Sequence, residues 1–267
     1  MSNGMPDASD TATPLIDVNV SWGAWPFQRF ADDTLEGLAY RLTSAGIVQA
    51  WISHVGGILH ADPRSFNLDL IEDVRNIEML RPVPVINPVF PGWANHLNQL
   101  RGESDVPAVK LYPAHHNYSL VDREFVDPLV DYLGAYGLKA LICLRVEDER
   151  TRYHGLRVVG HPVDDVIAFG KTYPLASAIC LNAYLPEARR IGQETDSIGV
   201  DISFTDWMFV LEELLTSIDI GRVYFGSHSP FLYTGAIVDK LMLSRLTDEQ
   251  KARIGGGNAQ DLLAARV

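Results

Sequence analysis

The sequence predicts an α/β protein that folds as a single (β/α)8 TIM barrel, and three observations lead to that prediction. The chain has 267 residues, close to the roughly 250 that one such barrel uses. Short apolar runs alternate with helical patterns, as in proteins with a parallel sheet. The apolar runs end in polar residues, and a barrel gathers such residues at the carboxyl ends of its strands.

The apolar runs are the predicted strands, and their ranges are 15–20, 48–54, 83–87, 106–112, 138–145, 175–182, 198–203 and 223–228. Because residues two apart face the same way, one parity would line the barrel and the other would pack under helices. The predicted inward residues are Asp17, Ala108, Cys143, Cys180, Gly199 and Gly226. The predicted outward residues are Val18, Val109, Leu111, Leu181, Ile202, Val223 and Phe225.

Helical patterns fill the intervals between these runs. The predicted helices cover 34–45, 66–80, 93–100, 121–136, 163–173, 185–194, 207–218 and 236–246, with a last helix over 259–264. We interpret the glycine run 255–257 as a helix stop. Residues 1–13 are small and polar, which predicts a disordered lead-in before a barrel over 14–267.

Composition limits the partners and the compartment. A net charge of -12 and a pI near 5.0 oppose binding to nucleic acid and to anionic membranes. No apolar run is long enough to span a bilayer, and no secretory signal pattern is present. The two cysteines, Cys143 and Cys180, fall in predicted strands, which fits a reducing compartment. We therefore expect a cytoplasmic protein.

Four segments carry a family resemblance. They are Leu15-Ile-Asp-Val-Asn-Val-Ser-Trp-Gly, Val109-Lys-Leu-Tyr-Pro, Val223-Tyr-Phe-Gly-Ser-His-Ser-Pro and Ile254-Gly-Gly-Gly-Asn-Ala-Gln-Asp-Leu-Leu. In this order and spacing the chain resembles the amidohydrolase-related TIM barrels, in the branch of aminocarboxymuconate-semialdehyde decarboxylase and the pyrone dicarboxylate lactonases. The resemblance implies an enzyme that acts on a small carboxylated compound.

Four residues, at three places along the chain, depart from the pattern that the family usually shows. Asn19 and Ser21 stand where the family has His-x-His, Arg145 lies where it has a histidine, and His228 replaces an aspartate. A divalent cation in such a site needs imidazole nitrogens and carboxylates. We therefore predict that the family's zinc is lost and that no cofactor is bound. The lactonase branch shows that the resemblance does not require a metal.

Three residues are the predicted catalytic groups. His228 would act as a general base toward water, with Asp201 orienting its ring, although His228 could instead only form hydrogen bonds in the barrel mouth. Lys110 would bind a substrate carboxylate or act as a Schiff-base amine. The alternative for Lys110 is an internal salt bridge with Asp17 or Glu147.

Substrate contacts are predicted around these groups. Arg145 would clamp a carboxylate, or else be neutralised by acidic residues of the stretch that follows it. The other predicted contacts are Asn19, Ser21, His54, Asn87, Tyr112, His116 and Asn182. Trp22, Trp25 and Phe27 would either cover the substrate or pack against the end of the barrel.

The leading functional prediction is a metal-independent hydrolase that attacks a lactone or related acyl carbon. A decarboxylase is the nearest alternative, because the same cationic groups would bind its substrate. A barrel that only binds a ligand is the alternative from another class. A homodimer is also expected, because Phe231–Tyr233 and the predicted helix with Trp207, Phe209 and Leu211 offer apolar residues. Packing of those residues on the barrel itself is the competing interpretation.

Overall fold

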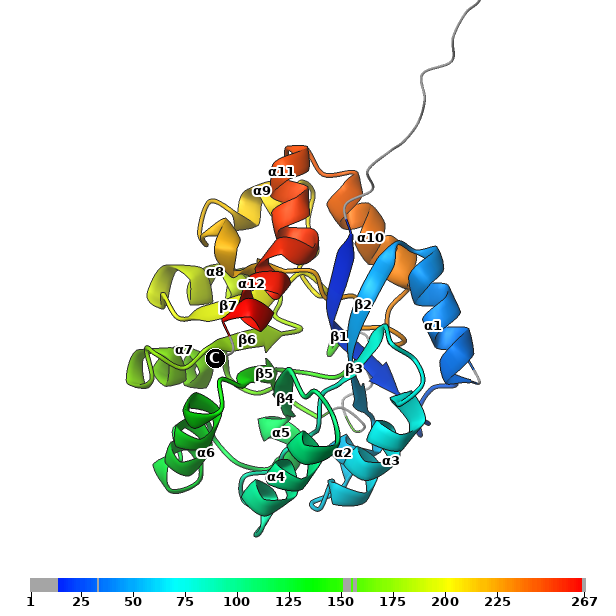
Figure 1. Ribbon diagram of the computed structural model, residues 1–267. Helices are drawn as coiled ribbons and strands as arrows, with labels where there is room; N and C mark the ends of the chain where they lie inside the picture. Colours follow the sequence, from blue (N-terminus) through cyan, green and yellow to red (C-terminus); the bar gives the residue numbers. More distant parts are fainter. Residues whose placement is uncertain (1–13, 33, 151–154, 156–157, 266–267) are drawn as a thin grey trace, which may run out of the picture.

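The computed structural model describes residues 14–32, 34–150, 155 and 158–265, and the predicted lead-in over 1–13 lies outside the described residues. Within these ranges the strands are β1 (Leu15–Trp22), β2 (Ile47–His54), β3 (Leu80–Pro82), β4 (Ala108–Leu111), β5 (Lys139–Cys143), β6 (Ala178–Leu181), β7 (Ile198–Asp201) and β8 (Val223–Tyr224). Strands β1 to β3 pair in order and in parallel, and so do β4 to β8. Figure 1 shows the strands around a common centre with helices outside them.

Backbone hydrogen bonds join the two groups of strands into a closed barrel. On one side, the residues that follow β3 pair with β4, since Ile86 N donates to Lys110 O at 3.0 Å. On the other side, β1 pairs with the residues that follow β8, since Val18 N donates to Phe225 O at 3.0 Å and Ser21 N donates to Ser229 O at 2.7 Å. The predicted (β/α)8 barrel is therefore confirmed, and within the described residues its closure leaves no unpaired sheet edge.

The helices that cover the barrel follow the predicted order. They are α1 (Leu35–Ser44), α3 (Arg64–Val74), α4 (Trp93–Glu103), α6 (Arg123–Ala135), α7 (Val163–Thr172), α8 (Leu185–Glu194), α9 (Val210–Leu214) and α10 (Thr234–Met242). Short helices α2 (Gly56–Leu59) and α5 (Pro113–His116) lie in the loops after β2 and β4. They place loop backbone close to the mouth of the barrel.

Several predicted helix boundaries differ from the structure, most of all the end of α3. Helix α3 ends at Val74 because the next residues turn into β3, with Ile77 N donating to Val74 O. Helix α9 starts at Val210 rather than at Trp207, because Phe209 has a left-handed backbone with φ of 56° that does not continue a helix. Leu211 is buried, so it contributes nothing to an exposed surface.

The glycine run near the C-terminus does not stop a helix. A π-helical turn, η3 (Arg253–Gly257), joins α11 (Asp248–Ala252) directly to α12 (Asn258–Ala264). The run packs against the start of β1, where a Cβ on Gly256 would lie 2.6 Å from the Pro14 carbonyl oxygen. Close approach of two backbones, rather than termination, therefore explains Gly256.

The predicted parity holds for β4 but fails for β6. In β4, Ala108 belongs to the interior cluster, while Val109 and Leu111 pack in the outer core under the helices. In β6 the assignment is reversed, because Leu181 is interior and Cys180 is in the outer core. Val18 is also interior, because a register shift between Asp17 and Val20 interrupts the alternation of β1.

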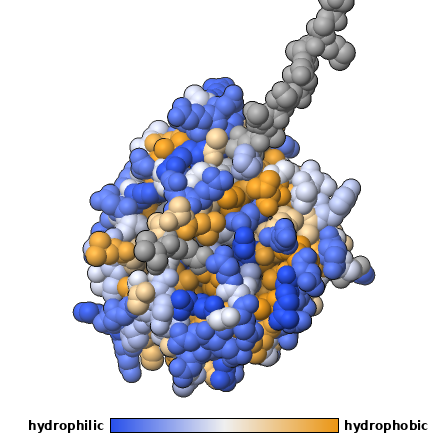
Figure 2. All heavy atoms as spheres, in the orientation of Figure 1, coloured by the Kyte–Doolittle hydropathy of each residue, from blue (hydrophilic) through white to orange (hydrophobic). Residues whose placement is uncertain are grey.

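The surface agrees with the acidic, polar composition. Figure 2 shows hydrophilic residues over most of the visible face, with smaller apolar areas between them. Among the described residues, no helix has both the length and the apolar character needed to cross a bilayer.

Candidate active site at the mouth of the barrel

Four polar side chains from four strand ends meet inside the mouth of the barrel. They are Asn19 of β1, Lys110 of β4, Asn182 just after β6 and Asp201 of β7, and all are fully or almost fully buried. Asn19 connects the others. Its Oδ1 accepts from Lys110 Nζ at 2.8 Å, and its Nδ2 donates to Asn182 Oδ1 at 2.7 Å and to Asp201 Oδ2 at 2.8 Å. We call these four residues the central cluster.

Lys110 brings a positive charge into this enclosed space. Only 1% of the side chain is exposed, and burial lowers the pKa of its amine, while Cys143, Asp201 and Asp17 act in the opposite direction. Its ammonium hydrogen bond goes to the Asn19 amide, rather than forming the simple salt bridge with Asp17 that the sequence offered as an alternative. A buried ammonium with a neutral partner is well suited to receive an anionic one.

Asp201 is the carboxyl group of the central cluster. It accepts from Asn19 Nδ2 and, through Oδ1, from the backbone N–H of Asn182 at 2.8 Å. Burial raises the pKa of Asp201 to about 6, against hydrogen bonds and the Lys110 charge, which lower it. A carboxyl group with such a pKa can give or take a proton near neutral pH.

His228 lies beside the central cluster with its ring held on both edges. Nε2 donates to the Val146 carbonyl oxygen at 2.6 Å, and Nδ1 lies 3.4 Å from Asn182 Nδ2. The ring stacks on Phe231 at a centroid distance of 4.8 Å. Burial and the Lys110 charge lower the pKa of His228 to about 3, so the imidazole is neutral at neutral pH.

The predicted pairing of Asp201 with His228 is corrected by these contacts. Asn182 lies between the two side chains: its backbone N–H donates to Asp201, and its Nδ2 faces His228. Asn182 can reach both because its backbone is left-handed, with φ of 60°, a conformation that asparagine tolerates better than most residues.

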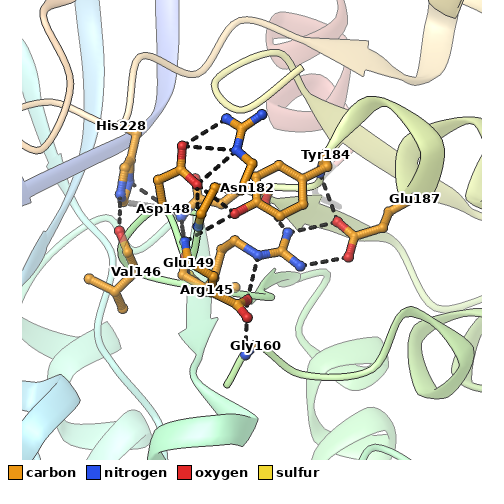
Figure 3. A network of polar contacts seen from close by, with 11 residues as sticks. Arg145, Val146, Asp148, Glu149, Gly160, Asn182, Tyr184, Glu187 and His228 are labelled. Carbon is orange, nitrogen blue, oxygen red and sulfur yellow. Dashed lines mark hydrogen bonds and ion pairs between the residues drawn. The ribbon is translucent and has the colours of Figure 1, made fainter. Parts of the chain in front are cut away.

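Arg145 forms its contacts within the protein (Figure 3). Its Nη1 and Nη2 donate to both carboxylate oxygens of Glu187 at 2.7 and 2.6 Å, and Nε donates to Glu149 Oε1 at 2.9 Å. Nη1 also donates to the Asn182 carbonyl oxygen at 2.7 Å. The guanidinium is therefore neutralised rather than presented to a substrate, which corrects the predicted carboxylate clamp.

Glu187 was not foreseen as a partner of Arg145. It lies in the first turn of α8, and its Oε2 also accepts from the backbone N–H of Tyr184 at 2.8 Å. The acid three residues after Tyr184 is the pattern of a capping box. That pattern signals a helix start, and it contains nothing that points to an arginine 42 residues earlier.

Tyr112 and Ser21 complete the enclosure near Lys110. Both are buried, and a side-chain hydrogen bond joins them. The Tyr112 ring centroid lies 5.7 Å from Lys110 Nζ, and burial raises the pKa of its hydroxyl well above the usual value. These two predicted contacts therefore do lie at the mouth.

His54, Asn87 and His116 make other contacts. His54 Nδ1 accepts from Gly56 N at 3.0 Å, Asn87 Nδ2 donates to Ala61 O at 2.9 Å, and His116 Nε2 donates to Gly57 O at 3.0 Å. Each side chain fastens loop backbone after β2 or β3. The structure does not bring them into hydrogen bonds with the central cluster.

A cavity of about 600 Å³ opens beside the mouth, in the loop between β1 and α1. Trp25, Phe27 and Phe30 are among its lining residues, together with Arg29. The Trp25 ring lies 5.3 Å from Phe231, which in turn stacks on His228. One aromatic ring thus separates the wall of this cavity from His228. Trp25 itself is nearly buried in a cluster with Tyr112 and Cys143, so it packs at the end of the barrel.

The residues at the mouth do not fit a divalent cation. Among the described residues no group of three or more histidine, cysteine, aspartate or glutamate side chains is arranged to hold one. The Asn19 oxygen accepts from the Lys110 ammonium, and Nε2 of His228 points to a carbonyl oxygen. The Lys110 ammonium lies 2.8 Å from Asn19 Oδ1 and would repel a metal ion bound at that oxygen.

Comparison with solved structures supports the resemblance at the level of the fold. A 5-carboxyvanillate decarboxylase from Novosphingobium aromaticivorans, solved with bound manganese, matches with a TM-score of 0.76 and 12% identity, covering 96% of this chain and 98% of that one. A 2,6-dihydroxybenzoate decarboxylase from Rhizobium matches with a TM-score of 0.68 and 11% identity, covering 94% and 99%. A probable 2-pyrone-4,6-dicarboxylic acid hydrolase from Acinetobacter baumannii, solved with citric acid, matches with a TM-score of 0.65 and 9% identity, covering 94% and 99%.

No family model and no curated protein matches the sequence. At these identities the three structures establish the barrel that the chain shares with them. A shared fold does not determine the reaction, which depends on the residues that this chain places at its site.

Proposed function

We propose that this chain is an enzyme of the amidohydrolase-related group that decarboxylates a small hydroxylated or oxo-substituted carboxylic acid without a metal ion. The observation that carries the proposal is the buried hydrogen-bonded series from Lys110 through Asn19 to Asp201. It places a cation and a carboxyl group with a pKa of about 6 on one amide at the carboxyl ends of the strands.

Lys110 would stabilise negative charge on the substrate. Decarboxylation breaks the bond between a carbon and its carboxylate, releases carbon dioxide and leaves the electron pair on that carbon. A conjugated oxygen that shares this charge would bind the Lys110 ammonium, and burial strengthens the attraction because water does not screen it.

Asp201 would supply the proton that replaces the carboxylate. Its raised pKa keeps part of the population protonated close to neutral pH. The substrate's body would enter through the cavity lined by Trp25 and Phe30, whose rings suit a planar ligand. Two of the structures compared above are named as decarboxylases, and the substrates in their names are aromatic acids.

Hydrolysis, which the sequence favoured, is the second candidate. It is favoured by the fold shared with a probable pyrone dicarboxylic acid hydrolase, and Lys110 would also polarise a lactone carbonyl. Hydrolysis ranks lower because of the state of His228, the predicted base. His228 Nε2 donates a hydrogen bond to the Val146 carbonyl oxygen, and the pKa of the ring is about 3. A base so weak removes a proton from water poorly at neutral pH.

The test is a turnover assay with 5-carboxyvanillate, 2,6-dihydroxybenzoate and 2-pyrone-4,6-dicarboxylate, reading carbon dioxide release and ring opening separately. We expect carbon dioxide release, and a fall in kcat of roughly 10²–10³-fold in Lys110→Met. Lys171→Met removes a lysine that pairs with Glu194 on the surface and is the matched control.

Ring opening without carbon dioxide release would support the hydrolase instead. Binding of these acids without turnover would support the alternative that the barrel binds a ligand and has no catalytic activity. Turnover in Lys110→Met equal to that of the unchanged protein would contradict the role of Lys110.

A further inference from the structure

We infer that Arg145 is a positioning residue: with Glu187 and Glu149 it holds residues 145–149, which follow β5, against the end of β6, so that the Val146 carbonyl fixes the His228 ring in one tautomer. This inference concerns the state of His228 and goes beyond the proposed reaction. It assigns Arg145 an action through another residue, where the sequence suggested contact with substrate.

The first step is the anchoring of Arg145 (Figure 3). Its side chain joins α8 through Glu187, the end of β6 through the Asn182 carbonyl oxygen, and its own loop through Glu149. The guanidinium also lies over the Tyr184 ring, with its carbon 4.0 Å from the centroid. Four contacts in different directions leave this nearly buried side chain a single position.

The second step is a reciprocal contact between Arg145 and Asn182. The side chain of Arg145 donates to the Asn182 carbonyl, and the Arg145 carbonyl accepts from Asn182 Nδ2 at 2.6 Å. This pair fixes the backbone of Arg145 against the end of β6. Because Val146 is the next residue, the direction of its carbonyl follows from the same constraint.

The third step is the contact made by that carbonyl. Val146 O accepts from His228 Nε2 at 2.6 Å, which requires the proton to be on Nε2 and leaves Nδ1 as an acceptor facing Asn182. The other groups around the ring are Lys110 of β4, Phe204 after β7 and Phe231 after β8. Of these, Lys110 is the charged one, and it opposes protonation of the ring.

Removing Arg145 would release this arrangement for an electrostatic reason. One guanidinium lies between the carboxylates of Glu187 and Glu149. Without it, two negative groups face each other, and like charges at this range repel. Residues 145–149 would then move outward and take the Val146 carbonyl away from His228 Nε2.

The experiment is ¹⁵N NMR of the histidine ring nitrogens, combined with hydrogen exchange. In the unchanged protein we expect His228 as a single neutral tautomer protonated on Nε2. In Arg145→Gln we expect averaged ring signals from two tautomers. We also expect exchange at the backbone amides of Glu149 and Gly160 to be about tenfold faster, since those amides are bonded to Tyr184 and Glu149 within the network.

Arg150→Gln is the matched control. It removes the same charge from the same stretch, but Arg150 is 55% exposed at its side chain and contacts Asp148 and the Tyr184 ring, not Glu187, Glu149 or Asn182. We expect no change in the His228 signals. Glu187→Gln keeps Arg145 and breaks one ion pair, so it should move both measurements in the same direction by a smaller amount.

Circular dichroism establishes that each variant is folded. If Arg145→Gln does not fold, Glu187→Gln decides the question. A folded variant that keeps the single Nε2 tautomer and unchanged exchange at Glu149 and Gly160 would overturn the inference, and it would do so whether or not any substrate is turned over.

Discussion

At the scale of single residues, Asn19 has the largest predicted effect on stability. Its two amide atoms satisfy Lys110, Asn182 and Asp201 at once, and none of the three is exposed to water. Asn19→Ala would leave a buried ammonium and a buried carboxyl group without this partner. We expect the free energy of unfolding to fall by about 3–5 kcal/mol, measured by urea denaturation.

Asn98→Ala is the control for this substitution. Asn98 accepts a hydrogen bond from Tyr132 at the surface, where water can replace it, so a change within about 0.5 kcal/mol is expected. An equal loss in both variants would contradict the central role of Asn19.

The raised pKa of Asp201 predicts how kcat depends on pH. If its protonated form delivers the proton, kcat is highest below pH 6 and falls as pH rises through the pKa of about 6. The decrease should approach tenfold per pH unit well above that value. A rate that rises through pH 6 would instead indicate that the ionised carboxylate acts as a base.

His228 predicts the acid sensitivity of the fold. Its pKa is about 3 in the folded protein, against an ordinary 6.5, so the unfolded chain binds the extra proton first as pH falls. The contribution of His228 to the free energy of unfolding is therefore fully present above pH 6.5. It is lost progressively toward pH 3, by roughly 1.4 kcal/mol per pH unit. His115, with a pKa of about 4, adds to the effect.

Urea denaturation at pH 7, 6, 5 and 4 measures this dependence. We expect a shallower loss of stability in His228→Gln than in the unchanged protein. His60→Gln, a substitution of the same kind at an exposed histidine, is the control. An identical dependence in His228→Gln would remove His228 as the cause.

At the scale of elements, two glycines have opposite expected effects. A Cβ on Gly226, just after β8, would lie 2.6 Å from Asp201 Oδ2 and 3.1 Å from Asn19 Cβ. Gly226→Ala would thus overpack the mouth and cost about 1–3 kcal/mol. Gly134, inside α6, has nothing within 4 Å of that position, so Gly134→Ala should stabilise by about 0.5–1 kcal/mol.

Thermal denaturation of the two variants measures the difference. Gly134→Ala should melt above the unchanged protein and Gly226→Ala below it. If Gly226→Ala leaves the melting temperature and the turnover unchanged, the close contact expected between the new Cβ and Asp201 is contradicted.

At the scale of the whole molecule, exposed apolar residues before α9 predict self-association. Trp207 and Met208 are each 74% exposed, and apolar groups of this size on a surface favour an interface, most often a symmetric dimer. Light scattering at micromolar concentration should give twice 29.6 kDa. Trp207→Ser with Met208→Ser should return the mass to 29.6 kDa, and that mass in the unchanged protein would exclude a stable dimer.

The sequence alone determined the architecture of this protein. Alternation of apolar runs with amphipathic segments is a local property that predicts a parallel sheet covered by helices. The chain length and the polar residues at the strand ends favour the closed form of that sheet. The same alternation placed Asn19, Lys110, Asp201 and His228 near one mouth, because the carboxyl ends of all strands in such a barrel lie together.

Only the tertiary structure decided how those residues are connected. The register shift in β1 and the left-handed backbone of Asn182 break the two-residue period, so parity could not place Val18, Leu181 or the Asn182 amide. Arg145 pairs with Glu187, which lies 42 residues later in the chain. Val146 acts through its backbone carbonyl, a group that every residue has, so its side chain gives no signal in the sequence. Local sequence encodes periodicity and turns, whereas the partner of a buried charge depends on how separate elements pack against one another.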